Sequence, residues 1–388
     1  MSVMRIFRRR TSLLSENSIR RAAGGVSLPV FVAAFHITYV RKAILNFHLL
    51  TALAAGVFMV IQGITGSIMA FEPELDRAFH SDLSYVRPGA EVLSIREITS
   101  AVSRQLGGEP VVAYEASLSP ELSCEVLLPS GIAYVDQYDG KVLGVRVRGQ
   151  TFLGYVRALH VRLAGGAAGR NILRWSAVAA LLSAISGFYL WWPIKRMSIR
   201  VSERASRRFW FDLHSTVGIC SLLPLTLLAA TGVALGFEDQ AASLIYKITH
   251  SAPTQISHAA RNATSRTSVI DADAAVAIAR SVVPGAVPYR VQMPQYGGLY
   301  RVELLYPNDR IAGSRNVVAL DPANGTVVSW SRSADLSRGD WILAANEAVH
   351  TGSILGMPTR VLASLFSLTV FVQAVSGAFV WLHRKRIL

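Results

Sequence analysis

The chain has 388 residues, of which 51% are hydrophobic and only 16% are charged. This composition lies outside the range of typical soluble domains and predicts a membrane protein. The formal net charge of +14 does not indicate nucleic-acid binding, because the basic residues cluster at the ends of apolar segments and not on one face with interleaved aromatic residues.

Four apolar segments are each long enough to cross a hydrocarbon core of about 30 Å as a helix. They cover residues 45–71, 172–192, 217–237 and 361–382. A shorter apolar stretch at 26–40 contains Pro29 and is predicted to be interfacial. Lysine and arginine crowd the N-terminus, the connection between the second and third segments, and the C-terminal tail. By the positive-inside rule, all three of these regions are predicted to be cytoplasmic.

Each of the two long connections outside the membrane is expected to form a small α+β module. Residues 94–106 and 271–283 show helical periodicity, and each is followed by β-rich runs separated by Asp139-Gly140 or Asn324-Gly325. The predicted fold is therefore a polytopic α-helical membrane protein with four transmembrane helices and two such modules. Since Cys124 lies in the first module and Cys220 in the third span, no disulfide is expected.

The predicted organisation has nine parts. They are a cytoplasmic or interfacial N-terminus (1–44), transmembrane helix 1 (45–71), the first outer module (72–159), the outer mouth with transmembrane helix 2 (160–192), a cytoplasmic loop (193–213), transmembrane helix 3 (214–237), the second outer module (238–349), the outer mouth with transmembrane helix 4 (350–382) and a cytoplasmic tail (383–388).

Two sequence patterns each occur twice. The pattern H-x16-T-G-x4-F-E begins at His48 and again at His214, and H-x25-S-G-x3-W-x3-K-R begins at His160 and again at His350. Such repetition predicts a duplicated two-helix unit with four matched histidines. If the two copies pack about an axis normal to the membrane, His48 faces His214 at the inner surface and His160 faces His350 at the outer surface.

The chain resembles the PepSY-associated transmembrane proteins, whose extracytoplasmic PepSY modules carry D-x-x-x-G hairpins like those at 136–140 and 321–325. The resemblance runs from about residue 42 and includes the Leu-His pairs at 159–160 and 213–214. In one departure, His48 follows Phe47 and not a leucine. The family includes ferric-siderophore reductases of the ferrioxamine type, so the resemblance implies b-type haem in a bacterial inner membrane and iron reduction at its periplasmic side.

The matched histidines suit this chemistry, because two imidazoles from different helices can hold a haem iron from both faces. Two haem b groups per chain are therefore expected, one bound by His48 and His214 and one by His160 and His350. Three further sets of residues have predicted roles. Arg162, Arg174 and Arg360 are predicted to pair with the propionates of the outer haem. Glu72 and Glu238 are predicted to orient the outer histidines or to bind substrate iron. The Thr-Gly and Ser-Gly pairs are predicted to serve helix packing.

The sequence contains no phosphate-binding loop, dinucleotide-binding glycine motif, nucleophile elbow or H-E-x-x-H zinc motif, so ATPase, flavin-domain and hydrolase functions have no support. The resulting prediction is an oxidoreductase acting on metal ions. It would pass electrons from a quinol or a cytoplasmic reductase to a periplasmic ferric siderophore and release Fe(II) for uptake. The alternatives are a non-catalytic PepSY membrane binding or regulatory protein, and a haem-b subunit that feeds another periplasmic redox enzyme.

Overall fold

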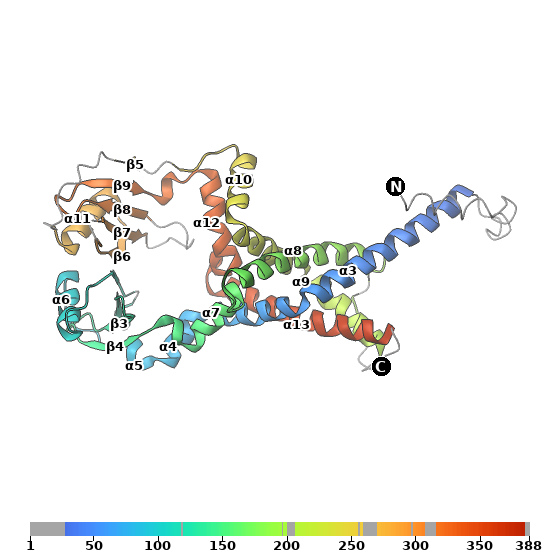
Figure 1. Cartoon of the computed structure of the whole chain (residues 1–388), viewed down its shortest axis with the longest axis horizontal. Helices are drawn as coiled ribbons and strands as arrows, with labels where there is room; N and C mark the ends of the chain where they lie inside the picture. The colour runs from blue at the N-terminus through green and yellow to red at the C-terminus, as the bar shows by residue number, and fades with distance from the viewer. Residues whose placement is uncertain are drawn as a thin grey trace.

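Four long helices form a bundle, and the two long connections between them lie together at one end of it (Figure 1). The computed structural model describes residues 28–384 except 118, 196, 200–205, 255–256, 259–269, 296–297 and 307–315. The long helices are α3 (Leu28–Met69), α8 (Gly166–Trp191), α9 (Arg207–Gly236) and α13 (Met357–Arg384). All four are apolar enough and long enough to cross a membrane, which confirms the predicted number of spans among the described residues.

All four helices start before the apolar segments that predicted them, and α3 and α9 do so by the largest margins. Helix α3 begins at Leu28, so the described part of the stretch predicted to be interfacial, residues 28–40, is continuous with the first span; residues 26–27 lie outside the described part of the chain. Pro29 lies in the first turn, where its missing N–H leaves no hydrogen bond unmade. Helix α9 begins at Arg207 because the Ser206 side chain accepts a hydrogen bond from the Phe209 N–H.

The bundle is a ring in which α3 and α9 lie diagonally opposite, each packed between α8 and α13. Small residues allow close approach at these interfaces. The hydroxyl of Ser67 on α3 donates to the Ser364 carbonyl of α13 at 2.9 Å. As a result, side chains of α3 and α9 that point inward meet on the axis of the bundle.

Four shorter helices join the bundle to the outer segments. Helices α4 (Glu72–Phe79) and α7 (Phe152–Arg162) belong to the first half of the chain, and α10 (Glu238–Thr249) and α12 (Arg338–His350) occupy the same places in the second. Leu163, the residue that follows α7, has a φ of 48° and so turns the chain sharply into α8. Gly352, with a φ of 72°, makes the corresponding turn after α12.

The two outer segments share one sheet. Its order is β4-β3-β2-β1-β6-β7-β8-β9-β5. The strands are β1 (Ala113–Glu115), β2 (Cys124–Leu127), β3 (Ile132–Val135), β4 (Val142–Arg146), β5 (Ser257–His258), β6 (Val287–Gln292), β7 (Tyr300–Leu305), β8 (Asn316–Leu320) and β9 (Val327–Ser331). The prediction of two modules is amended, because β1 of the first segment pairs antiparallel with β6 of the second. This pairing removes two exposed strand edges.

The predicted helices and hairpins of these segments are confirmed. Helices α6 (Ile95–Gln105) and α11 (Ala272–Val282) pack on the sheet through one core that includes Ile98 and Ala275. In both D-x-x-x-G turns the glycine, Gly140 or Gly325, has a φ above 70° and donates its N–H to the carbonyl of the leading aspartate. Cys124 is buried in β2 and Cys220 is exposed on α9, and both are free thiols.

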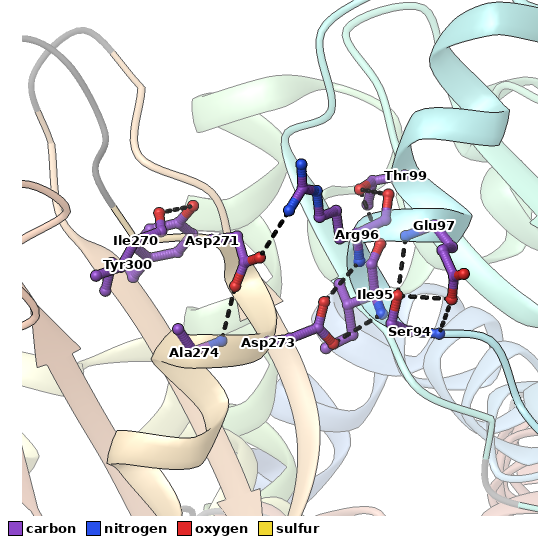
Figure 2. Close-up of polar contacts among 10 residues, drawn as sticks. All are labelled: Ser94, Ile95, Arg96, Glu97, Thr99, Ile270, Asp271, Asp273, Ala274 and Tyr300. Atoms are coloured by element: carbon purple, nitrogen blue, oxygen red, sulfur yellow. Dashed lines mark hydrogen bonds and ion pairs between the residues drawn. The ribbon is translucent and has the colours of Figure 1, made fainter.

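A carboxylate from the second segment caps a helix of the first (Figure 2). Asp273 of α11 accepts hydrogen bonds from the backbone N–H groups of Ile95 and Arg96, both at 2.9 Å. The Arg96 guanidinium also lies 3.6 Å from the carboxylate of Asp271. The N-terminus of α6 is therefore stabilised by a residue far away in the sequence, which ties the two halves of the sheet together.

Candidate functional site

The four matched histidines form two pairs. The ring centroids of His48 on α3 and His214 on α9 lie 6.3 Å apart, and those of His160 on α7 and His350 on α12 also lie 6.3 Å apart. The pairs occupy opposite ends of the bundle; the pair at the end that carries the sheet, His160 and His350, is called the outer pair here, and His48 with His214 is called the inner pair. His160 contacts Thr65, and because Thr65 follows His48 by 17 residues of one helix, the pairs are separated by about 25 Å along α3.

In the inner pair, each Nδ1 is held by the neighbouring span. The Nδ1 of His48 lies 3.1 Å from the Ser183 carbonyl and 3.0 Å from the Ser186 hydroxyl. His214 makes the matching contacts with Gln373 and Ser376 of α13, both at 3.1 Å. A carbonyl can only accept, so Nδ1 carries the proton in both rings and Nε2 keeps its lone pair for a metal.

In the outer pair, threonine hydroxyls take this role. Nδ1 of His160 lies 3.0 Å from the Thr65 hydroxyl, and Nδ1 of His350 lies 3.0 Å from that of Thr231. Each hydroxyl proton is already donated within its own helix, from Thr65 to the Ile61 carbonyl at 2.6 Å and from Thr231 to the Leu227 carbonyl at 2.8 Å. The hydroxyl oxygens therefore accept from Nδ1–H, and the outer rings have the same tautomer as the inner ones.

A glycine lies against the edge of every ring. A Cβ added at Gly66 would lie 3.0 Å from Cε1 of His160, and one at Gly187 would lie 3.2 Å from Cε1 of His48. Gly232 and Gly377 face His350 and His214 in the same way, at 3.3 and 3.1 Å. The prediction that the Thr-Gly and Ser-Gly pairs serve helix packing is thus incomplete, because they also hold and make room for the histidines.

Burial keeps the outer histidines neutral. It is the main reason that the pKa of His160 falls to about 4, and the nearby His350 and Arg157 lower it further. Burial lowers the pKa of His350 as well. Both imidazoles are therefore uncharged near pH 7, which is the form that binds metals.

A family model described as a PepSY-associated TM region matches residues 45–384. This chain belongs to the PepSY-associated transmembrane family. The match covers both histidine pairs and most of the length of each span. A comparison with curated proteins finds no match to the chain.

In this PepSY-associated protein, the spacing within each histidine pair matches one metal atom held between the two rings. Two metal–nitrogen bonds of about 2 Å, with about 1.1 Å from nitrogen to ring centre at each end, require a centroid separation of roughly 6.2 Å, close to the 6.3 Å of both pairs. No group of three or more histidine, cysteine, aspartate or glutamate residues in the described part of the chain could hold a bare metal ion. A porphyrin supplies the four remaining nitrogens itself, so two histidines are enough.

The three arginines predicted to bind propionates have different surroundings. Arg360 on α13 forms an ion pair with Glu74 of α4 at 2.6 Å and donates to the Ala70 carbonyl, so its guanidinium is already engaged. Arg174 lies over the ring of Phe237, 5.2 Å from its centroid, and its buried Nε has no hydrogen-bond partner. Arg162 is exposed in the last turn of α7. Of the three, Arg174 and Arg162 are the better candidates for an anionic group.

The role of orienting the outer histidines, predicted for Glu72 and Glu238, falls to Thr65 and Thr231. Glu72 forms an ion pair with Arg157 of α7, the helix that carries His160. Glu238 lies in the first turn of α10, where a negative charge stabilises the helix dipole. The threonines were already present in the repeated pattern, but small residues in apolar helices are more often packing residues than partners of histidine.

Proposed function

We propose that this protein is a di-haem reductase of the bacterial inner membrane that passes electrons outward to a ferric siderophore. The observation that carries the proposal is the presence of two equivalent histidine pairs, each spaced for one iron, at opposite ends of a four-span bundle. Bound haem of this kind supplies one-electron transfer, since its iron alternates between Fe(III) and Fe(II).

The residues of the chain would contribute binding and orientation. His48 and His214 would hold the inner haem, and His160 and His350 the outer one. The serine and threonine hydroxyls fix the rings through Nδ1, and the adjacent glycines leave the space that the ring edges need. Arg162 and Arg174 are candidates to pair with outer propionates.

The orientation follows from charge. Basic residues lie at the end of the bundle opposite the sheet, including Lys195 and Arg207 next to the loop between α8 and α9. By the positive-inside rule this end is cytoplasmic, together with both termini, and the sheet is periplasmic. The matched order of elements in the two halves supports descent from a duplicated two-helix unit.

The substrate would be ferric iron held by a siderophore at the periplasmic end. One electron converts Fe(III) to Fe(II), and the softer ion is held less tightly by the hard oxygen ligands of the chelator, so Fe(II) is released and the chelator is left intact. The electron would come from quinol or from a cytoplasmic reductase. The shared sheet, with Glu72 and Glu238 at its membrane side, would form the docking surface.

The test is a haem count by pyridine haemochrome on the detergent-purified protein. We expect about two b haems per chain in the wild type and about one after substitution of His48, His160, His214 or His350 by alanine. His383→Ala is the matched control, because His383 lies on α13 outside both pairs and its Nδ1 bonds to the Phe379 carbonyl at 2.8 Å.

The reduced protein is then mixed with a purified ferric siderophore in the presence of a colorimetric Fe(II) chelator. Formation of the Fe(II) complex supports the reductase. Haem without iron reduction would instead support a haem-b subunit that serves another enzyme. Absence of haem after expression with ample haem supply would contradict the proposal and favour a binding or regulatory protein.

A further inference from the structure

The first half of the chain exposes large apolar side chains beside the outer end of the bundle. Phe79 of α4 and Phe152 of α7 pack edge to face, with centroids 6.3 Å apart, yet they are 55% and 61% exposed. Tyr155, on the same side of α7, is 62% exposed. These three residues are called here the first shoulder, and a hollow of about 430 Å³ lies beside them.

The second half has a corresponding surface. Helices α10 and α12 are joined by a hydrogen bond from the Tyr246 hydroxyl to Asp340 at 2.6 Å. Around this joint four exposed apolar residues form the second shoulder, next to a hollow of about 590 Å³. They are Leu244, Ile248, Trp341 and Ile342.

Both shoulders continue directly from the spans. Helix α4 begins at Glu72 just after α3 ends at Met69, and α10 begins at Glu238 just after α9 ends at Gly236. Helices α7 and α12 lead through short turns into α8 and α13. In Figure 1, α10 and α12 lie across the end of the bundle and not along it. Both shoulders therefore lie at the sheet-side end of the spans.

We propose that both shoulders are seated in the headgroup layer of the membrane leaflet on the sheet side. Apolar and aromatic side chains on short helices beside spans are the usual means of contact with this layer. A bilayer surrounds the bundle and reaches the sheet-side end of both halves, so one occupant accounts for both shoulders. Lys247 and Arg338, which form no ion pair within the described residues, provide cations at the second shoulder for lipid phosphates.

Contact of the shoulders with the headgroup layer would also fix the position of the histidine pair at this end of the bundle. His160 belongs to α7 and His350 to α12, so the helices in contact with the headgroups are the ones that carry the two ligands. The membrane surface then fixes the depth of this pair from both sides. This inference depends on the membrane location of the protein and not on haem or on iron reduction.

Site-directed spin labelling in nanodiscs of phosphatidylethanolamine and phosphatidylglycerol tests the proposal. Single labels are placed at Phe152→Cys and Ile248→Cys on a Cys220→Ala background, in which the remaining Cys124 is only 1% exposed. Val287→Cys is the matched control, because Val287 is an apolar residue that is 50% exposed but lies on β6 of the sheet. Collision rates with O₂, which enters lipid, and with a water-soluble nickel chelate are measured.

We expect the O₂-to-nickel collision ratio to be several-fold higher at 152 and 248 than at 287. Equal ratios at all three positions would overturn the proposal. A label at either shoulder that is shielded from both reagents would also overturn it, because shielding indicates a protein partner or a second copy of the chain. Tyr155→Cys and Leu244→Cys replace the first two variants if either fails to elute as a folded protein.

Discussion

At the scale of single residues, the notable unit is a hydroxyl residue followed by glycine. Nδ1, Cε1 and Nε2 are consecutive atoms of the imidazole ring. In the first half of the bundle, Thr65 bonds Nδ1 of His160 while Gly66 leaves space for Cε1, so the next atom, Nε2, is left for a ligand. The same arrangement occurs at Ser186-Gly187 for His48. Two neighbouring residues of one helix thus fix both the tautomer and the position of a histidine ring.

The substitution Thr65→Val tests whether the Thr65 hydroxyl positions His160 through its hydrogen bond to Nδ1. Valine has nearly the same shape but leaves Nδ1–H of His160 without its acceptor, a loss of about 1–3 kcal/mol for a buried donor. We expect haem affinity at the outer pair to fall by about 10–100-fold, measured by titration of haem into haem-free protein. Thr369→Val, which removes a similar bond to the Phe366 carbonyl away from the histidines, should leave affinity unchanged. Equal effects of the two variants would contradict the positioning role.

The substitution Gly66→Ala tests whether the ring of His160 needs the space that Gly66 leaves beside it. Its Cβ would lie 3.0 Å from Cε1 of His160, so the ring must shift and haem content should fall to about one per chain. The control is Gly56→Ala in the same helix, where nothing lies within 4 Å of the added Cβ. That change should keep both haems and raise helix stability by up to about 1 kcal/mol. Full haem occupancy in Gly66→Ala would show that the ring does not need the glycine.

At the scale of elements, the outer histidines depend on short helices that must be held in place. Helix α7 is fixed near its middle by the ion pair of Arg157 with Glu72. Helix α12 is fixed at its start by Asp340, which accepts hydrogen bonds from Tyr246 of α10, from Ser337 at 2.8 Å and from the backbone N–H of Thr254 at 2.6 Å. The carboxylate of Asp340 therefore joins three separate segments at the start of the helix that ends with His350.

The stability supplied by Asp340 should depend on pH. Burial alone would raise its pKa, but the hydrogen bonds from Thr254, Tyr246 and Ser337 outweigh burial and lower the pKa from 3.8 to about 2. Because the folded pKa is the lower one, the stabilisation is complete above pH 3.8 and is lost as the pH falls towards 2.

The measurement is the difference in Tm between the wild type and Asp340→Asn across this range. We expect the wild type to melt higher by a constant margin from pH 7 down to about 4, and the margin to shrink below that. Tyr246→Phe, which keeps the carboxylate and its other donors, should show the same pH dependence with a smaller margin. A margin that does not change between pH 5 and 2.5 would rule out this role for the carboxylate.

At the scale of the whole molecule, the sequence predicted what is local or repeated. The four spans follow from long apolar runs, and the pairing of His48 with His214 and of His160 with His350 follows from matched spacing. The single sheet could not be predicted, because the pairing of β1 with β6 joins residues about 180 positions apart and neither strand carries a pattern that specifies its partner. The long start of α3 was missed because a proline near a helix start resembles a break.

The last prediction concerns the two pairs acting in series. If electrons enter at His48 and His214 and leave at His160 and His350, loss of the inner haem must isolate the outer one, since about 25 Å of bundle then separates it from the end where electrons enter. We expect His214→Ala to retain about one haem per chain, bound at the outer pair.

In vesicles with the sheet outside, a reductant trapped inside should reduce external ferric siderophore through the wild type and through His383→Ala, but not through His214→Ala. Dithionite added outside should still reduce the haem of His214→Ala, which separates a broken route from a lost site. Siderophore reduction by His214→Ala vesicles at the wild-type rate would mean that electrons reach the outer pair without the inner one, and the serial arrangement would have to be abandoned.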